Sequence, residues 1–410
     1  MSTRLIRTTL VGVTAIAAAG TALLTTPAAA ADVTVAAAET RQSGHGATQA
    51  AMDAAVAAGV PGVVAEARDA HGVWKGTSGV ADLTTQQPRG YGDRFRAGSV
   101  TKTLVATVLL QLQAEGKIDL DATVDHYLPG LVRGNGHDGT KITVRQLMNH
   151  TSGIFNFTED ATFAKKVLGI EFLETRYDDW TPQQVIALAL QNPPQFEPGT
   201  SWKYSNTNYL LLGLIIEKLT GRPYAEEIER RITGPLAMRA TYFPGTDPHV
   251  PAPTRHYSTF TEDPGKTYDV TELNPSWAWA AGEMVTNSSD LNRFYTALLS
   301  GRLLRPAQLQ QMTTTVSTEG NLPRQRYGLG LIEYETTCGV KVWGHSGGIH
   351  GSSTQAFGTK DGRHMITLNF NGDWVGGGKN VVSAEFCPPT TCLLNTSTTP
   401  PDQRLKLKRP

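Results

Sequence analysis

The sequence predicts an α/β protein of the α+β type, in which one antiparallel sheet is built from both ends of the chain and a helical domain is inserted between them. Strand-like runs occur early, at 62–67, 74–80 and 94–97. Residues from about 120 to 300 are mostly helical or loop, and strand-like runs return over 327–370. Glycine or Asp-Gly turns separate these later runs, as they do in antiparallel hairpins.

The first elements follow from periodicity and turn residues. Alanine and methionine recur at helical spacing over 47–58, which predicts a helix before the first strand. The run at 94–97 leads through Gly98 into a strongly helical pattern over 100–112. Gly116 marks the end of that helix, since glycine commonly follows the last helical turn.

Capping residues predict three helices in the central region. Thr143 is a candidate N-cap for the short helix after it. The segment 209–219 is apolar almost all round, which predicts a buried helix that ends at Gly221. Asn287 or the serine after it can cap a helix over 291–299. The final strands are expected at 327–334, 340–343, 353–358 and 364–370.

Both ends of the chain of 410 residues differ from its centre. Residues 1–31 carry two arginines, an apolar run and a small-residue stretch that suits signal peptidase, so we expect a secreted protein cleaved near residue 31. An uncleaved membrane anchor is the alternative. We expect a linker at 32–45, one large domain at 46–394 with its helical insertion at about 120–300, and a disordered tail at 395–410.

The composition limits the partners and cofactors. There are 37 basic and 37 acidic residues, and no basic stripe occurs, which argues against nucleic acid. The cysteines are Cys338, Cys387 and Cys392, of which one pair can close in an oxidising compartment, although spacing does not choose the pair. The sequence contains no HExxH or CxxC pattern, so it gives little support for a metal site. We expect a monomer that needs no metal or organic cofactor and binds no membrane after signal removal.

The first chemical motif is Ser99-Val100-Thr101-Lys102, where a strand gives way to a helix. Positions three apart share one helix face, so the Lys102 amine can reach the Ser99 hydroxyl. A buried lysine can lose its proton near neutral pH and serve as the base that activates the serine. The alternative is that Ser99 is only an N-cap and Lys102 a solvated residue. No other serine in the chain has a lysine three positions later.

Two further motifs follow in the sequence. Tyr204-Ser205-Asn206 places a phenol and an amide two residues apart, although it could simply cap the next helix. His345-Ser346-Gly347-Gly348 also contains a formal GxSxG pattern. We reject a nucleophile elbow there, because no βα units follow to supply the acid and the histidine that it needs.

The ordered trio SxxK, YxN and H-S-G resembles the serine β-lactamase and DD-peptidase superfamily, and most closely its secreted actinobacterial D-alanyl-D-alanine carboxypeptidases. The resemblance covers roughly residues 48–387 and includes the stretches 98–102, 142–150, 204–208 and 327–331. It implies the β-lactamase-like fold and a disulfide between Cys338 and Cys387. Cys392 would then be free or paired with another molecule.

The resemblance also implies a role for each site residue. Ser99 is acylated, Lys102 takes its proton, and Tyr204 passes a proton to the leaving amine. The remaining assignments are the polar floor (Asn206, His345), the oxyanion hole (backbone N–H of Ser99 and Gly348) and substrate binding (Ser346, Gly347, Trp277). A plain core or surface position is the alternative for Trp277.

Two departures from the carboxypeptidases bear on the substrate. Where those enzymes hold the free terminal carboxylate with a threonine and an arginine, this chain has Gly348 and Ile332. Arg326 or Lys341 would have to replace them. His150 is expected to be a core histidine with its hydrogen bonds satisfied.

The leading expectation is a D-Ala-D-Ala carboxypeptidase-like hydrolase that acts on small peptides or peptidoglycan and forms a covalent β-lactam adduct. The alternatives are a D-amino-acid amidase or D-peptide endopeptidase, an esterase, a weak β-lactamase, and a penicillin-binding sensor without catalysis.

Overall fold

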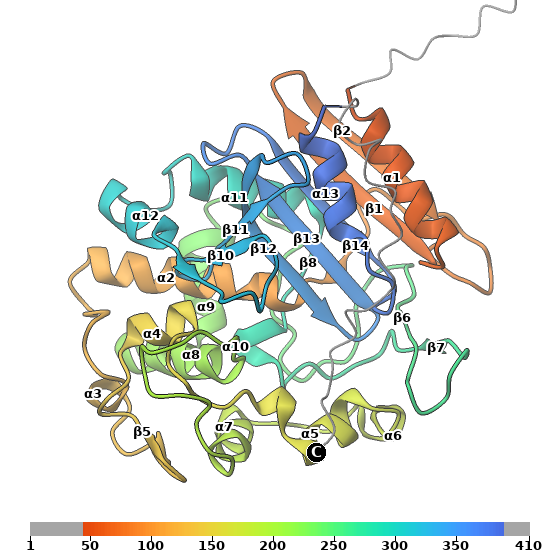
Figure 1. Cartoon of the computed structure of the whole chain (residues 1–410). Coiled ribbons are helices and arrows are strands. Elements are labelled where there is room, and N and C mark those ends of the chain that lie inside the picture. Colours follow the sequence, from red (N-terminus) through yellow and green to blue (C-terminus); the bar gives the residue numbers. More distant parts are fainter. Residues whose placement is uncertain (1–43, 389–410) are drawn as a thin grey trace, which may run out of the picture. The chain divides into compact units, whose positions relative to one another are not determined.

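The computed structural model describes residues 44–388 (Figure 1). The expected signal segment 1–31, most of the linker, the tail and Cys392 lie outside these residues. Within the described chain, eight strands form one antiparallel sheet in the order β2-β1-β14-β13-β12-β11-β10-β9. The strands are β1 (Gly62–Asp69), β2 (Gly72–Gly79), β9 (Val316–Ser317), β10 (Gln325–Tyr327), β11 (Ile332–Glu335), β12 (Lys341–Ile349), β13 (Ser352–Gly358) and β14 (Met365–Phe370).

The first and last parts of the sequence therefore share one sheet, in which β1 pairs with β14. This confirms the predicted fold class. Three short two-stranded ribbons lie outside the sheet, namely β3 (Phe95–Arg96) with β8 (Val285–Thr286), β4 (Arg133–Gly134) with β5 (His137–Asp138), and β6 (Tyr257–Ser258) with β7 (Tyr268–Asp269).

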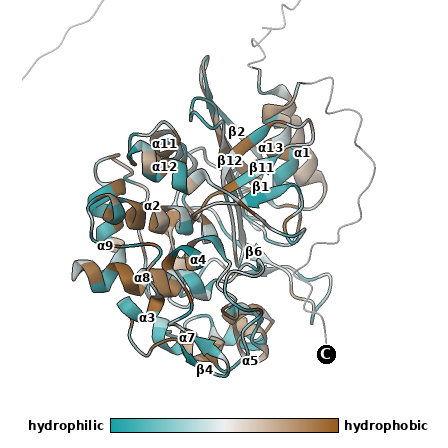
Figure 2. Ribbon diagram, turned by 60° about the vertical axis from the view of Figure 1, so that its left-hand side comes forward, coloured by the Kyte–Doolittle hydropathy of each residue, from teal (hydrophilic) through white to brown (hydrophobic). Residues whose placement is uncertain are grey.

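Helices cover both faces of the sheet. Figure 2 shows α1 (Gly46–Ala57) and α13 (Gly378–Phe386) on one side and the other large helices on the opposite side. Those include α2 (Thr101–Ala114), α8 (Thr207–Thr220), α11 (Ser288–Leu299) and α12 (Pro306–Thr313). The remaining α-helices are α3 (Val124–Tyr127), α4 (Val144–Asn149), α5 (Ala161–Phe163), α6 (Phe172–Thr175), α7 (Pro182–Leu190), α9 (Tyr224–Ile228) and α10 (Trp279–Gly282).

The helix α2 is central to the packing because it is apolar on almost every side. Most of its residues are buried, and it shares one hydrophobic cluster with α8 and α11. Figure 2 shows the hydrophobic colouring of α2 and α8. A second cluster lies between the sheet and the pair α1 and α13. A polar side chain at the start of α2 is thus held in a dry environment.

The predicted caps are present. Thr143 forms a capping box at the start of α4, and the Asn287 side chain accepts a hydrogen bond from the backbone N–H of Asp290 in α11. Gly221 ends α8 in the left-handed conformation.

One predicted strand is wrong. The run 327–334 is not continuous, since it forms the end of β10, a turn and the start of β11. Gly330 has φ +68°, and a Cβ there would lie 2.5 Å from the Ala106 Cβ, so the turn packs directly against α2. The alternation of apolar residues on both sides of this turn reads as one strand in the sequence.

Candidate active site

Ser99 lies in a 3-10 turn, Gly98–Val100, between β3 and α2. The sequence places it at the helix start, and the structure places it just before the first α-helical residue. Gly98 has φ +54°, and a Cβ there would lie 2.8 Å from the backbone nitrogen of Gly348 in β12. Glycine is required for both reasons, because the turn must be left-handed and the strand must approach closely. Ser99, the predicted nucleophile, is therefore held against β12.

Lys102 is fully buried, and its amine has three oxygen neighbours. The Nζ atom lies 2.9 Å from Ser99 Oγ, 2.8 Å from Asn206 Oδ1 and 2.6 Å from the carbonyl oxygen of Ala281. Burial lowers the pKa of Lys102 well below its usual value. No carboxylate of the described chain forms an ion pair with Lys102, so no neighbouring negative charge there raises the pKa of Lys102 again.

The neighbours of Lys102 determine where its lone pair points. A neutral amine has two N–H donors and one lone pair. The Ala281 carbonyl and Asn206 Oδ1 can only accept, so they take the two N–H groups, and the lone pair faces the Ser99 hydroxyl. This is the arrangement that a general base needs.

Asn156, which the motifs do not include, fixes the orientation of Asn206. Its Oδ1 accepts the backbone N–H of Asn206 at 3.0 Å, and a backbone N–H can only donate. The same Oδ1 therefore accepts from Asn206 Nδ2 at 3.3 Å, which turns Asn206 Oδ1 toward Lys102. Asn156 follows the stretch 142–150 closely, but no spacing rule marks it in the sequence.

Tyr204 is a neutral phenol in this site. Its hydroxyl is buried without a hydrogen bond of standard geometry in the described chain. Burial raises the pKa of Tyr204 well above its usual value, and the nearby Ser99 hydroxyl only partly opposes that rise. Lys102 Nζ lies 5.0 Å from the centre of the Tyr204 ring. Tyr204 is thus placed to carry a proton and is not a phenolate base at neutral pH.

His345 lies within β12, although the sequence pattern places it at the end of a strand. Its Nδ1 faces the Ser346 carbonyl at 2.5 Å and must donate, so Nε2 accepts from the Tyr327 hydroxyl at 2.9 Å. Burial and the nearby Lys102 lower the pKa of His345 to about 3, which keeps it neutral. His345 therefore adds no positive charge beside Lys102.

His150 connects the aromatic side chains behind Tyr204. Its ring centre lies 4.2 Å from that of Tyr204 and 4.7 Å from that of Tyr327. Nδ1 faces the backbone N–H of Ser205 at 3.2 Å, whereas the buried Nε2 has no partner within the described residues. The expectation of a fully satisfied core histidine holds for only one of its two nitrogens.

The glycines of the third motif bring β12 against the nucleophile. A Cβ on Gly347 would lie 1.9 Å from the Ala97 carbonyl oxygen and 2.9 Å from the Ser99 backbone nitrogen. A Cβ on Gly348 would meet nothing within 4 Å, and this residue is exposed. The backbone of Gly348 therefore borders open space next to Ser99, which is where an oxyanion hole is needed.

The two other predicted binding residues have different surroundings. Ser346 is half-buried and lies opposite Gln355 of the neighbouring strand β13. Trp277 is buried in an aromatic cluster, with ring centres 5.8 Å from Phe163 and 6.5 Å from Phe157, and its indole N–H has no partner within the described chain. Contact of Ser346 or Trp277 with substrate stays a prediction.

Neither Arg326 nor Lys341 is free to hold a substrate carboxylate in place of the threonine and arginine of the carboxypeptidases. Ile332 is buried in an apolar cluster. Lys341 is paired with Glu333 at 2.9 Å, and Arg326 donates to the Thr315 hydroxyl at 2.9 Å.

The structure contains the disulfide between Cys338 and Cys387 that the resemblance implies. Among residues 44–388, no group of three or more His, Cys, Asp or Glu side chains is arranged to hold a metal ion. No helix in the same part of the chain is long and apolar enough to cross a membrane.

A serine with a buried lysine at hydrogen-bond distance, beside a tyrosine and a glycine-rich strand, is an arrangement that agrees with a serine hydrolase. The chain belongs to the Beta-lactamase family, whose family model matches residues 46–374.

Proteins with D-amino-acid substrates are among its relatives. A D-stereospecific amidohydrolase from Streptomyces sp. is 56% identical with a TM-score of 0.80, over 84% of this chain and 98% of that one. A D-amino acid amidase from Ochrobactrum anthropi SV3, complexed with D-phenylalanine, is 28% identical with a TM-score of 0.73, over 83% and 97%. A D-aminopeptidase of Cereibacter sphaeroides (strain ATCC 17029 / ATH 2.4.9) is 28% identical, over 76% of this chain and 56% of the relative. The chain spans about half to three fifths of the length of the curated relatives it matches.

Proposed function

We propose that this protein hydrolyses amide bonds on the carbonyl side of D-amino acid residues through an acyl-Ser99 intermediate. The observation that carries the proposal is the open, uncharged position beside the nucleophile. Gly348 leaves space next to Ser99, and Ile332, Lys341 and Arg326 provide no grip for a carboxylate. A substrate with an uncharged leaving group fits this site better than one with a terminal carboxylate.

The first chemical step transfers the Ser99 proton to the Lys102 lone pair as Ser99 Oγ attacks the substrate carbonyl carbon. The former carbonyl oxygen gains negative charge and is stabilised by the backbone N–H groups of Ser99 and Gly348. Lys102 becomes an ammonium that still donates to Asn206 and Ala281.

The second step breaks the bond to the leaving amine. The leaving nitrogen takes a proton from the Tyr204 hydroxyl, which is reprotonated from the Lys102 ammonium. Neutral Lys102 then takes a proton from water as the water oxygen attacks the acyl carbon of the acyl-Ser99 ester. The bond between that carbon and Ser99 Oγ breaks, the Lys102 ammonium returns its proton to Oγ, and the D-amino acid leaves with a free carboxyl group. Attack by Ser99 and attack by water therefore both begin with a neutral lysine, in agreement with the burial of Lys102.

Similarity to the Streptomyces amidohydrolase and the Ochrobactrum amidase supports a substrate with a D-configured acyl residue. The second candidate is the D-Ala-D-Ala carboxypeptidase, which shares the same three motifs. We also propose export from the cytoplasm, which the composition of residues 1–31 supports and with which the disulfide agrees.

The substrate class is tested with two acylated peptides that both end in D-Ala-D-Ala, one with a free carboxylate and one with an amidated end. D-phenylalanine amide and L-phenylalanine amide are assayed beside them, with Ser99→Ala as the control. We expect the amidated peptide to be cleaved at least as fast as the free acid. We also expect D-phenylalanine amide to be cleaved faster than L-phenylalanine amide. A clear preference for the free acid would favour the carboxypeptidase instead.

A further inference from the structure

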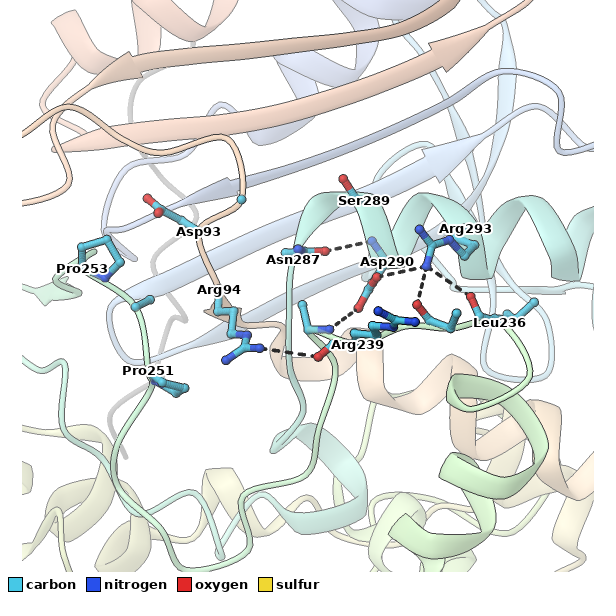
Figure 3. Close-up of a pocket in the computed structure, with 14 residues that line it drawn as sticks. Asp93, Arg94, Leu236, Arg239, Pro251, Pro253, Asn287, Ser289, Asp290 and Arg293 are labelled. Carbon is cyan, nitrogen blue, oxygen red and sulfur yellow. Dashed lines mark hydrogen bonds and ion pairs between the residues drawn. The ribbon is translucent and has the colours of Figure 1, made fainter.

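A cavity of about 770 Å³ lies apart from the catalytic residues, none of which lines it (Figure 3). Its walls come from the loop before β3, the segments 236–240 and 251–253, and the first turns of α11. Three arginines and two aspartates face it, namely Arg94, Arg239, Arg293, Asp93 and Asp290.

The two acids are already neutralised by the protein. Asp93 is paired at 3.4 Å with Arg89, a fully buried arginine behind the cavity wall. Asp290 accepts the backbone N–H of Ala240 at 2.8 Å and is paired at 3.6 Å with Arg293. Arg293 is thus paired with Asp290. Both aspartates already have a cationic partner, so neither balances the charge of Arg94 or Arg239.

Arg94 and Arg239 have no carboxylate partner within residues 44–388. Arg94 donates one bond, at 3.5 Å, to the backbone oxygen of Arg239, and its guanidinium lies 6.0 Å from the centre of the Tyr242 ring. The Arg239 side chain is exposed and makes no ion pair in this part of the chain. Two arginines without a carboxylate partner in the described chain therefore line one cavity, an arrangement that an anion would stabilise.

The rest of the wall agrees with an anionic ligand of moderate size. The Asn287 side-chain oxygen accepts the backbone N–H of Asp290 at 2.9 Å, and no hydrogen bond of the described chain uses the Asn287 side-chain amide N–H groups. Pro251, Pro253 and Leu236 provide apolar surface on two sides. Guanidinium groups match the two-oxygen edge of both carboxylates and phosphates.

We propose that this cavity is a second binding site, for a small polyanion whose carboxylate or phosphate groups are held by Arg94 and Arg239. The site is independent of the proposed reaction at Ser99, because it shares no residue with it.

The test is calorimetric titration of the whole protein with inorganic pyrophosphate and, separately, with citrate, at low ionic strength near pH 7. Wild type is compared with Arg239→Gln, with Arg94→Gln/Arg239→Gln, and with Arg305→Gln as an exposed arginine outside the cavity. The exposed Arg239 side chain forms no hydrogen bond or ion pair within residues 44–388, so we expect the single variant to fold as wild type does.

We expect saturable binding of at least one anion, weakened about tenfold by Arg239→Gln and further by the double variant, since a charge-assisted contact is lost each time. Arg305→Gln and Ser99→Ala should bind as wild type does. Stronger binding of pyrophosphate would identify a phosphate ligand, and stronger binding of citrate a carboxylate ligand. Absence of saturation below about 10 mM, unchanged binding in the double variant, or loss of binding in Ser99→Ala would each overturn the proposal.

Discussion

A methyl group added at Gly347 should remove activity, whereas one added at the next residue should not. The Cβ of Gly347→Ala would lie 1.9 Å from the Ala97 carbonyl oxygen and 2.9 Å from the Ser99 nitrogen, so β12 must move away from the nucleophile. The Cβ of Gly348→Ala meets nothing within 4 Å. The two variants differ in position by one residue and carry the same chemical change.

The magnitude follows from the oxyanion hole. Displacing one of its two donors costs about 100-fold or more in kcat, which corresponds to about 2.7 kcal/mol of transition-state stabilisation. Overpacking of a tight site costs about 1–3 kcal/mol of stability, which most domains tolerate. Gly347→Ala should therefore stay folded but lose about 100-fold in kcat, and Gly348→Ala should stay within a few-fold of wild type.

The assay is hydrolysis of D-phenylalanine amide by both variants, with thermal unfolding and circular dichroism to establish that each is folded. If Gly347→Ala keeps kcat within about threefold of wild type, the close packing of β12 on Ser99 is not what builds the site. Equal losses in the two variants would refute the assignment of open space to Gly348.

Three further changes test other parts of the structure. Asn156→Asp keeps the acceptor for Asn206 but adds negative charge near Lys102, so the acid limb of the pH profile of kcat/KM should move to higher pH; an unmoved limb would contradict the positioning of Lys102 through this pair. His45, whose pKa is raised chiefly by Glu385, stabilises the fold fully below its unfolded pKa of about 6.5, and this contribution is lost as pH rises through the folded pKa. The loss of Tm in Glu385→Gln should therefore be greater at about pH 5.5 than at about pH 8.5, and an equal loss at both pH values would exclude the ion pair as its cause. Cys387→Ser removes the disulfide and should lower stability by about 2–4 kcal/mol in denaturant titration, with kcat unchanged; a large change in kcat would show that the bridge shapes the site.

The fold was predictable because its signals are local and mutually consistent. The apolar pattern of α2, the capping box at Thr143 and the glycine at the end of α8 are each readable in a short window. The break between β10 and β11 was not, since the close packing of the Gly330 turn against Ala106 joins segments that are far apart in the sequence. The pairing of the first strands with the last ones, as in β1 with β14, was predicted from the family resemblance and from the strand-like runs near both ends of the sequence.

The site was predictable where side chains within a motif act on one another, as Ser99 and Lys102 do. The Ala281 carbonyl was not, because a backbone oxygen carries no sequence signal. Asn156 and the unsatisfied nitrogen of His150 depend on how separate loops meet, which spacing along the chain does not reveal. The sequence suggests a buried lysine at this position, but the full burial that lowers the pKa of Lys102 is visible only in the packed structure.

The proposed reaction depends most directly on Ser99 as the acylated nucleophile and on neutral Lys102 as its base. Intact-mass spectrometry after brief mixing with a D-phenylalanine ester, followed by peptide mapping, measures both. We predict an added D-phenylalanyl mass on the peptide that contains Ser99, no adduct in Ser99→Ala, and accumulation slowed by about 100-fold or more in Lys102→Ala. Turnover without an adduct at Ser99, or acylation of Lys102→Ala at the wild-type rate, would contradict the account.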